Sequence, residues 1–117
     1  MVNFGGVESV PEQFRKRTLH VHNPQVTLMR TTPSENAELG ALIAKKLNAS
    51  RGPVTLLIPL KGVSAIDKEG QKFHDPAADA ALFAAVRGNV DSKVRVIELD
   101  LHINDPAFSE ALAANFR

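Results

Sequence analysis

Val54-Thr55-Leu56-Leu57-Ile58-Pro59-Leu60 is the longest apolar run of the chain, and this run decides the fold class. Its apolar residues would fall on both faces of an extended strand, as they do in a central strand of a parallel sheet that is covered on both sides. The run is also far too short to cross a bilayer. It therefore predicts a buried β-strand.

A long helix is expected directly before this strand. Thr32-Pro33-Ser34-Glu35 matches a capping box with proline at the first helical position. Apolar residues then recur at helical spacing until Gly52-Pro53 ends the pattern, namely Leu39, Leu42, Ile43 and Leu47.

Two further helices and one further strand are expected after it. Asp75-Pro76 and Asp105-Pro106 each combine an aspartate cap with a proline in the first turn. The first helix has an inner stripe of Leu82, Phe83 and Val86, and the second carries Phe108, Leu112 and Phe116. The strand between the two helices is expected at residues 94–99.

The first third of the chain is less regular. A short helix is expected at residues 11–17, followed by extended segments at residues 18–22 and 26–30. Asn23-Pro24 separates these segments, because proline has no N–H to offer a ladder. They form either a tight hairpin or one bent strand.

The order of strands and helices predicts an α/β fold. Right-handed crossovers would give a small Rossmann-like, three-layer unit, with a mostly parallel sheet of three to four strands flanked by helices. Residues 1–117 are expected to form this single unit. Because so thin a sheet leaves an exposed edge, we also expect a homo-oligomer.

Composition excludes several classes of function. The formal net charge is +1, with 14 basic and 13 acidic residues, so the chain lacks the basic excess that is typical of nucleic-acid binding. The absence of cysteine rules out disulfides, zinc–thiolate sites and thiol catalysis. No signal-peptide core and no metal-ligand spacing are present, so we expect a cytoplasmic protein without a membrane partner or a metal site.

The most informative polar residues follow the expected strands. Ligands of open α/β sheets bind beyond the carboxyl ends of the strands. The residues expected there to bind a ligand are Asn23, Arg30, Thr31, Thr32, Lys61, Gly62, Ser64, Asn104 and Asp105, and His102 lies among them.

These residue types favour a small anionic ligand. Arg30-Thr31-Thr32 would offer a guanidinium, hydroxyls and helix N-terminal amides, and Gly62 would let the backbone approach a ligand beside Lys61. His102 is the candidate catalytic acid or base. The alternatives are structural: Thr32 and Asp105 as helix caps, Gly62 as a turn residue, and His102 as a group that binds backbone.

Three stretches, residues 22–33, 59–67 and 102–106, resemble the tomato mosaic virus resistance protein-like ATP-binding family, and the resemblance runs from about Met1 to the end of the chain. Bacterial and fungal members of this family are mostly uncharacterised. The resemblance implies a longer protein with two Rossmann-like halves, of which this chain is similar to the C-terminal part of the second.

The resemblance also bears on function. It implies a nucleotide or phosphometabolite as ligand, with ATP as a possible cofactor of the full-length protein. The chain has neither a Walker A loop nor a G-x-G-x-x-G fingerprint, so ATP is not placed on particular residues here. The alternatives are an enzyme acting on a small carboxylate or phosphorylated metabolite, and a protein-interaction module of the kind found in the plant member.

Overall fold

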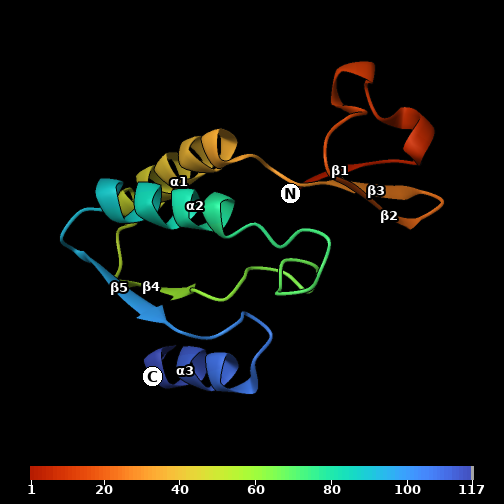
Figure 1. Cartoon of the computed structure of the whole chain (residues 1–117). Coiled ribbons are helices and arrows are strands. Elements are labelled where there is room, and N and C mark those ends of the chain that lie inside the picture. The colour runs from red at the N-terminus through yellow and green to blue at the C-terminus, as the bar shows by residue number, and fades with distance from the viewer. Residues whose placement is uncertain (117) are drawn as a thin grey trace. The chain divides into compact units, whose positions relative to one another are not determined.

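The computed structural model describes residues 1–116, which form two compact units that divide between Thr32 and Pro33 (Figure 1). The first unit consists of short strands and turns, and the second contains all three α-helices. Each unit is described by itself.

The first unit is a three-stranded antiparallel sheet with the strand order β1-β3-β2. The strands are β1 (Val2–Phe4), β2 (Leu19–Asn23) and β3 (Val26–Met29). Met29 is paired with Val2 on one side and with Leu19 on the other. The short helix expected at residues 11–17 is instead a single 3-10 turn, η2 (Glu12–Phe14), preceded by a similar turn, η1 (Val7–Ser9).

The two strands on either side of Pro24-Gln25, β2 and β3, form a hairpin, which settles the alternative left open by the sequence. Its register shifts between Val21 and Asn23, beside the turn. A connection of only two residues cannot carry a chain back to the start of a parallel neighbour, so these strands pair antiparallel. The expected single, mostly parallel sheet of three to four strands is therefore corrected to two separate sheets, of which only one is parallel.

The second unit has three layers. Its parallel sheet contains β4 (Val54–Pro59) and β5 (Val94–Leu99), paired in register from Val54↔Val94 to Pro59↔Leu99. Helices α1 (Pro33–Asn48) and α2 (Pro76–Asn89) lie on one face of the sheet, and α3 (Pro106–Phe116) lies on the other (Figure 1). The α/β class is confirmed by these elements.

Helix α2 begins as its sequence indicates. The Asp75 carboxylate accepts a hydrogen bond from the Ala78 amide at 3.0 Å, and Pro76 occupies the first turn. Phe83 and Val86 of the expected stripe are buried, together with Ile58 of β4 and Val94 of β5. These side chains belong to the buried apolar core of the second unit.

Helix α1 packs on α2 through small and polar residues. Asn36, Gly40 and Ala44 are its buried positions, and the Asn36 side chain donates to the Ala78 carbonyl at 2.7 Å. The Leu39, Leu42 and Ile43 side chains are instead 40%, 49% and 38% exposed. Much of the apolar stripe of α1 therefore stays exposed.

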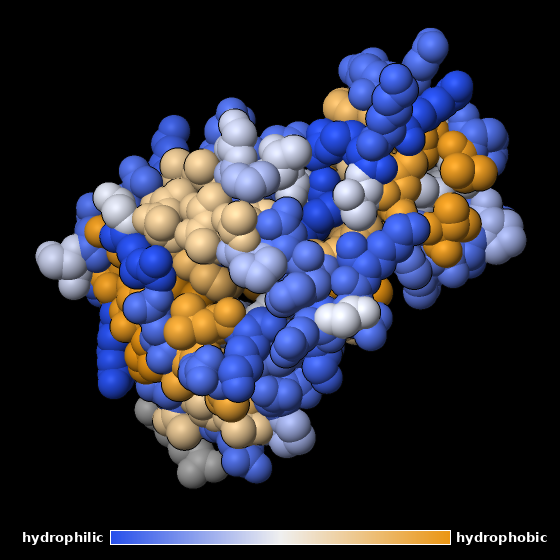
Figure 2. All heavy atoms as spheres, viewed as in Figure 1, coloured by the Kyte–Doolittle hydropathy of each residue, from blue (hydrophilic) through white to orange (hydrophobic). Residues whose placement is uncertain are grey.

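Hydrophobic side chains also reach the surface of the second unit. In the view of Figure 2 they gather at the level of the sheet, between the layer of α1 and α2 and helix α3. On α3 only Phe108 is buried, whereas Leu112 is 47% exposed. A two-stranded sheet covers too little area to bury the apolar faces of three helices.

Candidate functional site

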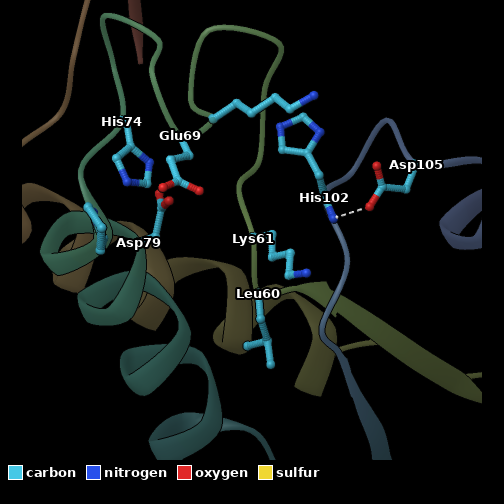
Figure 3. A pocket seen from close by; sticks show the side chains of 9 residues that line it. Leu60, Lys61, Glu69, His74, Asp79, His102 and Asp105 are labelled. Carbon is cyan, nitrogen blue, oxygen red and sulfur yellow. Dashed lines mark hydrogen bonds between the residues drawn. The ribbon is translucent and has the colours of Figure 1, made fainter.

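A cavity of about 420 Å³ lies beyond the carboxyl ends of β4 and β5 (Figure 3). It is bordered by the segment that follows β4, by the first turn of α2 and by the segment that follows β5. The lining residues are Leu60, Lys61, Lys68, Glu69, His74, Pro76, Asp79, His102 and Asp105. This is the position at which parallel α/β sheets bind ligands.

Backbone hydrogen bonds continue beyond the two strands to Leu60 and Lys61, which line the cavity. The Leu60 amide donates to the Leu99 carbonyl at 2.9 Å, and the Lys61 amide donates to the Leu101 carbonyl at 3.0 Å. Gly62 then turns the chain with φ +134°. A Cβ atom on Gly62 would lie 1.9 Å from the Asp67 carbonyl oxygen, so no other residue fits this turn without a backbone shift.

The His102 ring joins the two segments. It is 4% exposed, and its Nε2 lies 2.9 Å from the Ser64 carbonyl and 3.2 Å from the Asp67 carbonyl. The Asn104 amide donates to Nδ1 at 3.1 Å. These partners assign the neutral tautomer with the proton on Nε2, since Nε2 faces two acceptors and Nδ1 faces a donor.

Two carboxylates and one hydroxyl brace the same turns. Asp67 accepts from the Val63 amide at 3.1 Å, and Asp105 accepts from the His102 amide at 2.9 Å. The Ser64 hydroxyl accepts from the Ile66 amide at 3.2 Å. Many polar residues of the segments 59–67 and 102–106 thus stabilise the loops themselves, and Asp105 stabilises the turn before α3.

The charged residues of the cavity are mixed in sign. Two lysines, Lys61 and Lys68, line it together with the carboxylates of Glu69, Asp79 and Asp105. The Lys61 side chain is 59% exposed, and its ammonium lies 3.8 Å from the Asp100 carboxylate. In the view of Figure 3, Glu69, His74 and Asp79 stand on one side and Lys61, His102 and Asp105 on the other.

Four lining residues, Lys68, Glu69, His74 and Asp79, were not among the expected ligand-binding positions. Asp79 could have been found from the sequence, because helical spacing places it on the same side of α2 as Phe83 and Val86. In the structure it is 6% exposed. A carboxylate among the inner positions of a helix is rare and indicates a specific role. His74 was noticed only as the neighbour of a helix cap.

The structure places six of the ten expected residues in or beside the cavity. Lys61, His102 and Asp105 line the cavity, and Gly62, Ser64 and Asn104 lie in the segments that shape it. Asn23, Arg30, Thr31 and Thr32 belong to the first unit instead.

Two of these four residues, Asn23 and Arg30, make local hydrogen bonds within the first unit. Asn23 accepts from the Gln25 amide at 2.8 Å and closes the hairpin turn. Arg30 and Thr31 are 7% and 3% exposed, and the Arg30 carbonyl accepts from the Arg17 guanidinium at 2.9 Å.

Residues 1–116 contain neither a cluster of metal ligands nor a membrane-spanning helix. These residues include no group of three or more histidine, cysteine, aspartate or glutamate side chains placed to hold a metal ion. Within the same range, no helix has the length and apolar character needed to span a membrane.

Comparison with known proteins identifies the family. All 117 residues match the model described as the C-terminal domain of an uncharacterised protein family, UPF0261, and the chain belongs to this family. A UPF0261 protein of Rhizobium meliloti is 55% identical over the whole chain, which covers 30% of that protein. The resemblance inferred from the three motifs is confirmed.

Two tomato proteins extend the comparison. The ToMV resistance protein Tm-1 and the ToMV susceptible protein tm-1 of Solanum lycopersicum are 43% and 42% identical over 99% of the chain, which spans 16% of each. The resistant and susceptible forms are thus equally similar to this chain. The chain spans less than a third of the length of all three relatives.

Proposed function

We propose that this member of the UPF0261 family binds a small phosphorylated ligand, a nucleotide or a phosphometabolite, in the cavity beyond β4 and β5. The observation that supports the proposal is a cavity of about 420 Å³ at this position, with Lys61 and Lys68 in its lining. This volume lies within the usual range for small-molecule sites, about 300–1,000 Å³.

The mixed lining narrows the kind of ligand. Ammonium groups bind phosphate, whereas carboxylates accept hydrogen bonds from hydroxyl or amino groups. A ligand that carries phosphate at one end and several hydroxyls at the other fits both sets. Simple phosphate offers a partner to the lysines but carries no sugar hydroxyl or amino group for the carboxylate side of the lining, so we expect it to bind more weakly than a sugar phosphate or a nucleotide.

Calorimetry on the natural full-length protein tests the proposal with ATP, ADP, ribose 5-phosphate and inorganic phosphate. Lys61→Ala should weaken binding of the tightest of these about tenfold, since a charge-assisted contact contributes about 1.4 kcal/mol or more. The matched control is Lys46→Ala, which removes the same charge from the exposed last turn of α1. Binding that is absent, or is equal in all three proteins, would refute the assignment.

An enzymatic alternative is favoured by one observation, the exposed His74 imidazole in the lining of the same cavity as Glu69 and Asp79. Proton transfer needs a ring nitrogen that can reach the substrate. Both ring nitrogens of His102 are bound by backbone groups, so the geometry favours His74 over His102 for this role. Turnover of a phosphorylated metabolite that is lost in His74→Ala would support the alternative.

A further inference from the structure

Among residues 1–116, no strand pairs with the edge of β4 that faces away from β5. The Leu60 amide points toward β5, and alternate residues of a strand direct their backbone groups the same way. The amides of Leu56 and Ile58 therefore face β5, and those of Thr55 and Leu57 face outward. The next outward position is Pro59, which has no N–H to leave unpaired.

Hollows lie on both faces of this edge. One, of about 610 Å³, is lined by Thr55 and Leu57 together with Leu112 and Phe116 of α3. The other, of about 140 Å³, is lined by Leu57 and by Ile43 of α1, among other apolar residues. An extended segment along β4 would place alternate side chains into the two hollows.

Helix α1 contributes Ile43 to one of the hollows beside the same edge. It lies beside α2 on one face of the sheet (Figure 1), and its Leu39, Leu42 and Ile43 side chains are exposed, with Ile43 in the lining of the smaller hollow. Crossover helices in parallel sheets lie over the strands that they join, in a right-handed sense. The position of α1 therefore leaves room for one more strand beyond β4.

The two sheet edges differ in charge. β5 carries the exposed residues Arg95 and Glu98, and Glu98 forms an ion pair with Arg87. β4 contains no charged residue. Charges are a common device that keeps an edge strand from pairing, so the uncharged edge of β4 is the one suited to accept a strand.

We propose that this edge of β4 binds a further parallel β-strand from the part of the full-length family protein that lies outside residues 1–117. The sequence had predicted pairing with a second copy of the chain, but this region spans only 30% of the Rhizobium meliloti relative, so a covalently linked strand is available at far higher effective concentration. The carboxyl end of that strand would lie beside Leu60 and Lys61. The loop after it would then add another wall to the ligand cavity.

Hydrogen–deuterium exchange on the natural full-length protein tests this proposal. The Thr55 and Leu57 amides should exchange as slowly as those of Leu56 and Ile58, which is roughly 100-fold or more below the rate of a free edge. Fast exchange at Thr55 and Leu57 would overturn the proposal. Slow exchange that is lost on dilution to a monomer would also overturn it, because the occupant would then be a second copy.

Discussion

Gly62 is the residue that allows the tight turn after Lys61, in the segment that borders the cavity. Its φ of +134° and the close approach of the Asp67 carbonyl allow no side chain. The sequence indicated a glycine that lets the backbone approach a ligand. The structure shows that the close neighbour is another part of the same loop.

Substituting Gly62 by alanine should therefore destabilise the protein by at least about 2 kcal/mol, from backbone strain and a backbone clash together. Gly70→Ala is the matched control, because Gly70 also has a positive φ, of 83°, but its Cβ would meet nothing within 4 Å. In Gly70→Ala the free energy of unfolding should fall by about 1–2 kcal/mol. Urea unfolding compares the two, and equal losses would show that the clash is relieved.

His102 is expected to act on the loops as a positioning residue. His102→Ala removes a buried ring and leaves the Ser64 and Asp67 carbonyls without this donor, so the free energy of unfolding should fall by about 2–4 kcal/mol. His74→Ala changes an exposed imidazole in the same cavity and should shift stability by less than about 0.5 kcal/mol. A small loss for His102→Ala would contradict the proposed bridging role.

At the scale of elements, periodicity located α1 but did not identify its buried face. Its leucine stripe predicts an apolar contact, yet the contact with α2 is made by Gly40 and Ala44, because small residues let two helices approach closely. Sequence alone cannot show which of two faces meets a given neighbour. The leucines are consistent with a different partner surface beyond β4.

The close contact of α1 with α2 gives a prediction with opposite signs for two helical glycines. A Cβ at Gly40 would lie 2.6 Å from the Leu82 carbonyl oxygen, whereas a Cβ at Gly88 would meet nothing within 4 Å. Gly88→Ala should stabilise the protein by about 0.5–1 kcal/mol through helix propensity. Gly40→Ala should destabilise it by about 1–2 kcal/mol despite the same gain, and thermal unfolding distinguishes these signs.

The strand β4 was placed correctly by its apolar run, and β5 was predicted with the same bounds that the structure shows. The pairing partners of the earlier strands, β1 to β3, were not predicted correctly. Whether strands pair within one sheet depends on contacts that are distant in sequence, and the two-residue turn at Pro24-Gln25 is the local feature that argues for an antiparallel pair.

At the scale of the whole molecule, the rule that ligands bind beyond the carboxyl ends of parallel strands indicated where the cavity lies. It identified only some of the residues that line the cavity. It named Lys61, His102 and Asp105, because residues after parallel strands share one edge of the sheet. It missed Glu69, His74 and Asp79, because a loop of irregular structure and the inner side of a helix turn carry no simple periodicity. The matched family region is also a part of a longer protein, so the complete lining includes whatever the remaining chain contributes under the proposal for β4.

The central claim, that the cavity beyond β4 and β5 binds a phosphorylated ligand, is tested most directly by NMR titration of the natural full-length protein with ATP and, separately, with ribose 5-phosphate. The account predicts saturable amide shifts concentrated at residues 60–74 and 100–105, whose midpoint moves to about tenfold higher ligand concentration in Lys61→Ala and is unchanged in Lys46→Ala. Shifts that are absent, or that are confined to residues remote from these two segments, would contradict it.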